Sequence, residues 1–503
     1  MSTDREQSRS EISFKLSRND WVLLVLFILT LPLVNPWIRG DGVGYYAMAR
    51  APLVQHNLDF RPDWYAGNTS FRLTKIDPVT NQIYPGEFTD TGHINNHFSI
   101  GPAILWSPFL IPVHAGVKLA RALGSHVSDN GFSAPYRFAI SLATALYGFL
   151  GLWLSYRLAR KYVPDYWAFL ATIAIWFSSS LPVYMYFNPS WSHAHSAFTV
   201  ALFLWYWDLT RASRSWQQWI VLGLLGALMM NVYYVNAAVL FIPLLESIGR
   251  YLRAAQTKDW PQFGNLFVQN FTFALCVIAG FLPTLLTKKA IYGGYLKFGY
   301  KEQWFWNSPA ILKVAFSSDH GLFSWTPVLL LAIIGLFFLS RIDRALASYL
   351  LVVFALYLYT IGCYESWDGI SSFGNRFFVS LTPIFILGLA ALFDAIARAL
   401  SATGAGERPA TILARIATAV LILWNLGLIF QWGTHLIPAR GPISWREAAY
   451  NQVAVVPEQA SLTVYRYMTQ RKNMMNRIEQ EDVGHIKSTQ PGNQPLQRPE
   501  TAP

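Results

Sequence analysis

Long apolar runs recur along most of this 503-residue chain, and they limit its fold more than any other feature. About 20 apolar residues let a helix cross a bilayer. Only 13% of the residues are charged, against roughly 25% in typical soluble domains. The pattern therefore predicts an all-α, polytopic membrane protein. The runs fall near residues 21–38, 138–156, 166–186, 192–208, 217–232, 234–249, 267–287, 326–340, 347–363, 377–397 and 412–432.

Short basic clusters alternate with these runs, as the positive-inside rule describes for cytoplasmic loops. They account for much of the net charge of +11 without a nucleic-acid partner. If all of them are cytoplasmic, residues 1–20 form a cytoplasmic tail and residues 39–97 a large external loop. Residues 433–503 then form an external tail, with disorder expected from about residue 488. The clusters are Arg157/Arg160/Lys161, Arg211/Arg214, Arg250/Arg253/Lys258, Arg341/Arg344 and Arg398/Arg408/Arg415.

Residues 98–123 do not fit this alternation, because a single crossing there would put the next run on the wrong side. Pro102, Pro108 and Pro112 interrupt the segment, and proline removes helix hydrogen bonds. We therefore expect the segment to re-enter or to cross twice in short pieces. The transmembrane module at 21–432 then has an odd number of spans, 11 or 13, with the C-terminus outside.

Asp41 directly follows the first run, within the segment Arg39–Tyr46 (RGDGVGYY). A carboxylate at the membrane surface is well placed to act as a general base on a lipid-linked substrate. Aspartate is also a favoured helix N-cap, so Asp41 has a second interpretation as the cap of an amphipathic stretch at 42–56. The two roles are compatible.

Other polar residues gather in loops that are predicted to lie on the same external side as Asp41. Such a gathering is typical of a shared substrate cavity, although external loops are polar in any membrane protein. His193 and His195 would point to different faces of a helix, so at most one should face the cavity. The candidate substrate-binding residues in these loops are Tyr45, Tyr46, His193, Tyr234, Asp319, His320 and Asp368.

The first loop also offers a weak metal-binding pattern. Glu87, Asp90, His93 and His97 supply carboxylate and imidazole groups within eleven residues. His93 and His97 have helical i,i+4 spacing, which suits a divalent metal ion, whereas the glycine and asparagine content opposes a regular helix. Glu87, His93 and His97 are the candidate ligands of such an ion.

Arg376 and Lys288 are the candidate groups for binding a phosphate. Arg376 follows Gly374 and precedes a span. A guanidinium there either pairs bidentately with a lipid phosphate or anchors the span to headgroups. Lys288 ends another run on the predicted external side, where the positive-inside rule disfavours lysine.

Three segments resemble the GT-C superfamily of membrane glycosyltransferases: Gly40–Tyr46, His320–Pro327 and Trp367–Phe377. The resemblance covers roughly residues 20–432. It is closest to the branch that holds protein O-mannosyltransferases and lipid A aminoarabinose transferases, which is family 39-like. It implies a GT-C-like bundle with juxtamembrane helices in the first loop.

The same resemblance implies an inverting transfer of a hexosyl or pentosyl unit from a polyprenyl-phosphate donor. The acceptor would be a glycolipid, a polysaccharide or a protein, and the site would face the periplasm or exterior of a bacterial inner membrane. Asp41 would act as the base. Glu87 or Asp90 would match a second acidic position, although the usual adjacent pairing is missing here, which leaves open whether a divalent metal is used.

Two other functions remain as alternatives. A lipid or polysaccharide transporter would place charged groups inside the bilayer and often shows repeated halves, and neither feature is seen in this sequence. A non-catalytic assembly protein would have no need to gather acidic, basic and histidine side chains on one face, although loop polarity alone can imitate such a gathering.

Overall fold

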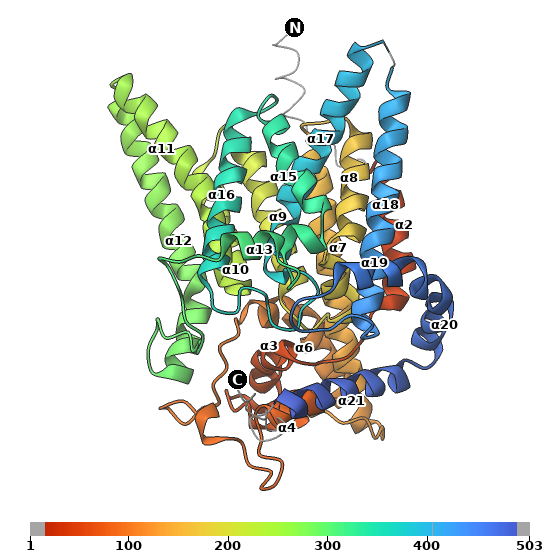
Figure 1. The fold of residues 1–503 in the computed structure, drawn as a ribbon. Helices are drawn as coiled ribbons and strands as arrows, with labels where there is room; N and C mark the ends of the chain where they lie inside the picture. The colour runs from red at the N-terminus through yellow and green to blue at the C-terminus, as the bar shows by residue number, and fades with distance from the viewer. Residues whose placement is uncertain (1–15, 405, 490–503) are drawn as a thin grey trace, which may run out of the picture.

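The computed structural model describes residues 16–404 and 406–489, which form an almost entirely helical molecule (Figure 1). Pairing between extended segments is limited, among these residues, to three isolated bridges. The predicted all-α fold is confirmed. Most helices run side by side in one bundle, and a group of shorter helices lies across one end of it (Figure 1).

Eleven helices of the described chain form the bundle. Seven helices of the described chain are long and apolar enough to cross a membrane, and six of these belong to the bundle. The protein is therefore a polytopic membrane protein, as the sequence predicted. The bundle helices are α2 (Arg18–Thr30), α7 (Ala134–Ala159), α8 (Asp165–Ser178), α9 (His193–Thr210), α10 (Trp216–Val232), α11 (Phe241–Gln256), α12 (Trp260–Tyr292), α15 (Val328–Leu339), α16 (Arg344–Cys363), α17 (Thr382–Ala402) and α18 (Arg408–Gly433).

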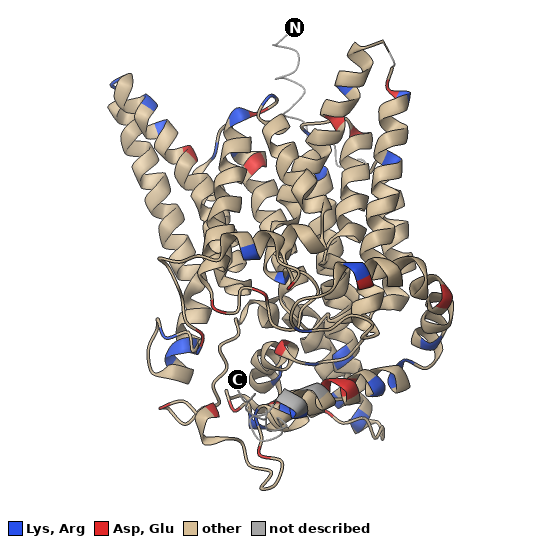
Figure 2. Ribbon diagram, viewed as in Figure 1, with Lys and Arg blue, Asp and Glu red and all other residues tan. Residues whose placement is uncertain are grey.

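The end of the bundle where α2 begins, here called the N end, is tied together by ion pairs. Arg160, after α7, pairs with Asp20 of α2 at 3.2 Å. Arg211, after α9, pairs with Asp343, just before α16. These ion pairs join interhelical segments that are far apart in the sequence. The segments lie at one end of the bundle, as the alternation of basic clusters predicted. Figure 2 shows the charged residues concentrated toward the two ends of the bundle.

The opposite end, here called the loop end, holds the first loop and the C-terminal tail. The first loop contains three short helices, as predicted, and the tail contains three more. The tail helix α21 packs on α5. It continues to Thr489, so the expected disorder falls almost wholly outside the described residues. These six helices are α3 (Asp41–Arg50), α4 (Arg61–Ala66), α5 (Thr69–Leu73), α19 (Trp445–Val453), α20 (Val455–Thr469) and α21 (Arg471–Thr489).

The proline-containing segment at 98–123 does not cross in two short pieces, so that part of the expectation is wrong. It forms the single helix α6 (Gly101–Ala122), which stays at the loop end. Ser99 donates to the carbonyl of Val232, the last residue of α10, at 2.6 Å. Trp106 donates to Thr144 Oγ1 at 2.9 Å, which places α6 along the first half of α7.

Candidate active site

Asp41 and Arg376 meet at the loop end in an ion pair, with 3.0 Å between Asp41 Oδ2 and Arg376 Nη2. Asp41 is the first residue of α3, and Arg376 begins the 3-10 turn η6 (Arg376–Leu381) that leads into α17. The Asp41 side chain keeps 32% of its surface exposed and that of Arg376 keeps 11%. Both line the same cavity. The residues selected from the sequence as a base and a phosphate-binding group therefore share one site.

Two glycines beside Asp41 allow the chain to enter α3 in this position. Gly40 has a φ of +52°, a conformation that residues with a side chain rarely adopt. A Cβ on Gly42 would lie 1.9 Å from Ser190 Oγ, so only glycine fits against that loop. Asp41 is the first helical residue and Gly40 occupies the cap position, so the N-cap interpretation is wrong. The carboxylate instead pairs with Arg376 at the positive end of α3.

Trp191 braces both partners of the ion pair. The guanidinium carbon of Arg376 lies 4.5 Å from the centre of the Trp191 ring, which is a cation–π contact. The indole Nε1 donates to the carbonyl of Arg39 at 3.0 Å, and a Cβ on Gly40 would lie 3.2 Å from the ring. Trp191 therefore sets the distance between the turn that carries Asp41 and the turn that carries Arg376.

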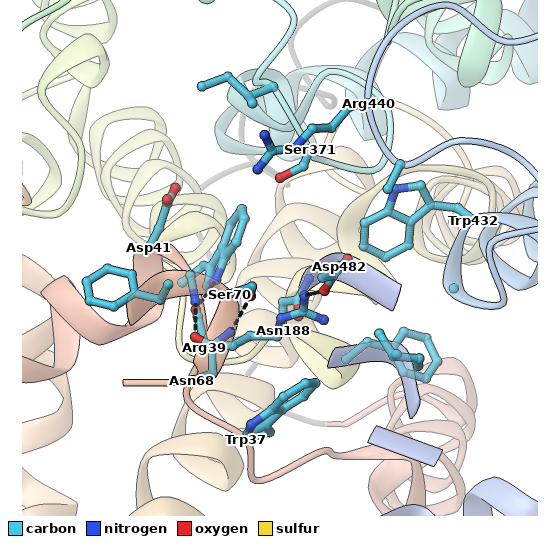
Figure 3. A pocket seen from close by; sticks show the side chains of 18 of the residues that line it. Trp37, Arg39, Asp41, Asn68, Ser70, Asn188, Ser371, Trp432, Arg440 and Asp482 are labelled. Atoms are coloured by element: carbon cyan, nitrogen blue, oxygen red, sulfur yellow. Dashed lines mark hydrogen bonds and ion pairs between the residues drawn. The ribbon is translucent and has the colours of Figure 1, made fainter. Parts of the chain in front are cut away.

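The cavity beside this pair has a volume of about 790 Å³ and is lined by a set of polar residues, called the polar wall, and a set of apolar residues, called the apolar wall. Figure 3 shows Asp41 on one side of the view and Trp432 on the other, with Asp482 between them and Arg440 beside Ser371. The polar wall includes Arg39, Asp41, Asn68, Lys75, His97, Asn188, Lys301, Arg376 and Arg440. The apolar wall includes Leu33, Phe187, Leu426, Ile429, Phe430, Trp432, Val464, Tyr467, Met474, Met475, Ile478 and Ile486.

Glu87 holds two of the cavity's lysines without lining the cavity itself. Its two oxygens lie 2.9 Å from Lys75 Nζ and 3.1 Å from Lys301 Nζ. Glu87 is buried, whereas Asp90 is exposed in the loop that follows. Neither carboxylate lies in the cavity wall with Asp41. The structure therefore does not bring the two proposed second acidic residues into the site.

The structure also does not gather the predicted metal ligands Glu87, His93 and His97. Among the described residues, no three His, Cys, Asp or Glu side chains lie close enough together to hold a metal ion. His93 Nδ1 contacts Thr91 Oγ1 at 3.0 Å, at the surface of the loop. The assignment of these three residues as a metal site is wrong, because the loop between them does not form the helix that their spacing requires.

His97 does line the cavity, as a neutral side chain. Burial and the charges of Lys288 and Lys75 lower its pKa to about 3. Its ring lies 4.9 Å from that of Tyr300. At neutral pH, His97 therefore offers hydrogen bonding without charge.

Tyr45 and Tyr46 support α3 and do not line the cavity. The hydroxyl of Tyr45 accepts a hydrogen bond from Ser192 Oγ at 2.8 Å, and burial together with the Asp41 charge raises its pKa. Tyr46 points elsewhere and donates to the carbonyl of Gly131. The two tyrosines thus fix the helix that presents Asp41.

His193, Tyr234 and Lys288 also lie outside the cavity wall. His193 is buried, with its ring centre 4.7 Å from that of Tyr184. Lys288 Nζ donates to the three carbonyls of residues 96–98 at 3.0–3.2 Å, and it lies 5.9 Å from the ring centre of Tyr234. Lys288 therefore connects the first loop to α12. These three hydrogen bonds use all the N–H donors of its ammonium group.

Asp319, His320 and Asp368 form a group near Arg376 but outside the cavity wall. His320 Nε2 lies 3.7 Å from Asp319 Oδ1, and the ring of His320 stacks on Trp325. Burial and the Arg376 charge lower the pKa of His320 to about 4. Burial and the nearby Asp368 raise the pKa of Asp319. Asp368 belongs to the loop that leads to Arg376, and none of the three residues lines the cavity.

The C-terminal tail supplies a wall that the sequence analysis did not predict. Asp482 of α21 pairs with Arg39 across the cavity. His435, just after α18, contacts Asp482 and Glu481, and these contacts raise its pKa. Hydrogen bonds to His435 and the charge of Arg39 lower the pKa of Asp482 despite its burial. The cluster of acidic residues in the tail was the one sequence signal for this wall. It does not identify its partners Arg39 and His435, which lie far away in the sequence.

The chain was compared with known protein families, sequences and solved structures. No family model matches the chain, and no curated protein matches its sequence. The structure is similar to the crystal structure of ArnT from Cupriavidus metallidurans bound to undecaprenyl phosphate. That match has 14% sequence identity and a TM-score of 0.43, and it covers 93% of this chain and 78% of that one.

Proposed function

We propose that this protein is an inverting glycosyltransferase that moves a sugar from a polyprenyl-phosphate donor to an acceptor at the membrane surface. The observation that carries the proposal is the Asp41–Arg376 pair in the wall of a large cavity that is lined by both charged and apolar side chains. The sequence resemblance of the Asp41 and Arg376 segments to GT-C enzymes agrees with it.

The apolar and charged residues that line the cavity suit the chain and the phosphate of a lipid phosphate, respectively. Residues of α18, which is long and apolar enough to cross a membrane, contribute Leu426, Ile429 and Phe430 to the apolar wall. An isoprenoid chain can therefore pass from the bilayer into the cavity along α18. Lys75 and Lys301 line the polar wall, where they can stabilise the charge that develops on a departing lipid phosphate.

Asp41 has the exposure and position that a general base needs. An acceptor hydroxyl or amine attacks the anomeric carbon of the donor, and the carboxylate of Asp41 takes the proton as the new bond forms. The bond between the anomeric carbon and the phosphate oxygen breaks, and its electrons leave on the lipid phosphate. Arg376 holds Asp41 in place and lies beside the leaving group. Attack from the face opposite the phosphate inverts the anomeric centre.

The predicted orientation supports a lipid-linked donor. The basic clusters of the chain gather at the N end, and the positive-inside rule assigns that end to the cytoplasm. The cavity at the loop end then faces the periplasm or the exterior, where nucleotide sugars are absent. A donor carried by a membrane lipid is the activated sugar that remains. The acceptor, whether glycolipid, polysaccharide or protein, reaches the cavity from the same side.

The test is sugar release by the purified protein in lipid nanodiscs. Radiolabelled undecaprenyl-phosphate hexoses and pentoses are supplied together with crude membrane acceptors, and Asp41→Asn is compared with the wild type. We expect the wild type to consume at least one donor and Asp41→Asn to consume it about a hundredfold or more slowly. Equal consumption by both proteins would move the base elsewhere. No consumption with any donor and acceptor would contradict the proposal and favour a transporter or a non-catalytic protein.

A further inference from the structure

We propose that Glu479, on the C-terminal helix α21, positions Asp41 for catalysis through the side chain of Asn68. This inference rests on the proposed function, because it assigns a role to a tail residue in that same site. Glu479 is far from the spans in sequence and does not line the cavity. It acts on the reacting group only through another residue, so it is a positioning residue.

A continuous set of hydrogen bonds joins Glu479 to the turn before Asp41. Asn68 Nδ2 donates to both oxygens of Glu479 at 3.0 Å. The other end of the same amide, Asn68 Oδ1, accepts from the backbone N–H of Gly40 at 3.1 Å. Ser70 N–H also donates to Glu479. One amide group therefore contacts the tail on one side and fixes the residue next to Asp41 on the other.

Gly40 is the point at which such a contact has most influence. Gly40 has a φ of +52°, and as a glycine it can adopt many other backbone conformations, so hydrogen bonds to its surroundings determine which one it keeps. Immediately after it, the N–H of Gly42 bonds to the carbonyl of Arg39 at 2.9 Å, which closes the turn around Asp41. If Gly40 N–H lost its partner, the turn would be free to relax, and the carboxylate would move relative to Arg376.

The burial of Glu479 supports a positioning role. It is 9% exposed, and among the described residues no lysine, arginine or histidine pairs with it. A buried carboxylate without a cation is costly unless hydrogen bonds satisfy it. The donors that satisfy Glu479 belong to the segment 68–70, so this cost is met only when α21 is seated on the first loop.

A second contact holds the same turn from its other side. Arg39 pairs with Asp482, which lies one helical turn after Glu479 on the same helix. The carbonyl of Arg39 also accepts from Trp191 Nε1. The two carboxylates of α21 therefore hold residues 39 and 40 together, immediately before the base.

An exchange of amide and carboxylate between Glu479 and Asn68 tests this inference directly. In Glu479→Gln alone, one of the two oxygens that accept from Asn68 Nδ2 is replaced by an NH₂ group, which cannot accept. In Asn68→Asp alone, two carboxylates would face each other. In the double variant, the new amide on α21 donates to one oxygen of the new carboxylate in the first loop, while the other oxygen still accepts from Gly40 N–H. Glu458→Gln is the matched control, since Glu458 is exposed on α20.

The full-length variants are measured in nanodiscs by two readouts. Hydrogen exchange at the Gly40–Gly42 amides reports the contact without requiring turnover, and donor consumption reports its effect on kcat and KM. We expect each single variant to exchange faster and to lose about tenfold to a hundredfold in kcat at little cost in donor KM, because small misplacements are costly in catalysis. The double variant should recover both, and Glu458→Gln should match the wild type.

The outcomes separate this inference from the proposed function. Single variants with wild-type exchange and kcat would overturn the inference while leaving the transferase intact. A double variant that stays as slow as the single variants would also overturn it, even with exchange restored. A wild type that consumes no donor would overturn the proposed function, and the exchange measurements would then still decide whether Glu479 holds the turn at Gly40.

Discussion

The two ends of the helix bundle use charged residues in different ways. At the N end, the buried Asp208 is shared between Lys161 and Arg211 and joins separate helices. At the loop end, Asp41 pairs, within the described part of the chain, with Arg376 alone and keeps about a third of its side chain exposed to a cavity. The N-end pairs are satisfied within the protein. The loop-end pair is satisfied only in part, which leaves both groups able to meet a ligand.

This contrast shows why the number of charges near a membrane surface says little about function. Buried ion pairs with several partners mainly specify which helices meet. A carboxylate and a guanidinium that share one contact beside a cavity can exchange that contact for a substrate. The same substitution of a charged residue should therefore lower stability at the N end and activity at the loop end.

The largest expected difference comes from two Asp→Asn variants. Asp41→Asn should lower the rate of donor consumption by about 10²–10⁴, the contribution typical of a general base, with an unchanged melting temperature. Asp20→Asn should lower the melting temperature, because Asp20 accepts from Trp153 and pairs with Arg160. The folded fraction of Asp20→Asn should keep the wild-type kcat. Equal activity loss in both variants would mean that the two ends do not differ as described.

Asp208→Asn should have the next largest effect, on stability alone. Removing one partner of a buried ion pair typically costs about 3–5 kcal/mol, and Asp208 contacts Lys161, Tyr162 and Arg211. The measurement is the denaturation midpoint in detergent micelles, with turnover of the folded protein as the control. A midpoint within error of the wild type would show that this end is not held by its charges.

Substitutions of the two lysines and of Glu87 should change the donor KM in opposite directions. Lys75→Gln combined with Lys301→Gln should raise the donor KM by about tenfold or more, since a hydrogen bond to a charged group contributes about 1.5–3 kcal/mol. Glu87→Gln should leave kcat unchanged and lower KM, because it frees both lysines for a phosphate. A large fall in kcat for Glu87→Gln would instead restore Glu87 as a second catalytic carboxylate.

The smallest expected effect is a pH dependence of the tail. The pKa of His435 is raised in the folded protein by Asp482 and Glu481, so its contribution to tail docking is complete below the ordinary histidine pKa of about 6.5. The contribution of His435 is lost as pH rises through its higher pKa in the folded protein. The lowered pKa of Asp482 keeps that carboxylate ionised throughout this window.

Amide exchange in α21, corrected for its intrinsic pH dependence, measures this effect. Protection should fall by about two- to fivefold from pH 6 to pH 9, as expected for a partly exposed ion pair. Glu481 also contacts Arg477. His435→Gln should show no such change. A pH response that persists in His435→Gln would assign it to another group.

The sequence predicted the bundle better than it predicted the site. Apolar runs and alternating basic clusters are repeated signals, so one misread segment changed little. That segment, α6, is as apolar as a crossing helix, and only its contacts with Thr144 and Val232 show that it stays at one end. Hydropathy does not distinguish a helix covered by lipid from one covered in part by protein.

Residues of the site were predicted correctly only where their neighbours in the sequence single them out. Asp41 follows a span and lies between glycines, and Arg376 precedes a span, so both stand out and both line the cavity. Lys288 stands out for the same reason, yet it binds backbone carbonyls. Glu479 and Asp482 belong to a polar helix whose composition resembles that of any exposed helix. Their partners are determined by the folded chain and not by their neighbours in sequence.

The closure of the cavity by α21 also determines when the site can exist. Arg39 and Asp482, the partners that close it, are separated by 443 positions, and all eleven bundle helices of the described chain lie between or before them. Because the ribosome makes the chain from its N-terminus, α21 emerges only after the last crossing has been synthesised. A nascent chain therefore carries Asp41 at the membrane surface without a complete substrate cavity. The order of synthesis thus delays the formation of a working site until the membrane domain is in place.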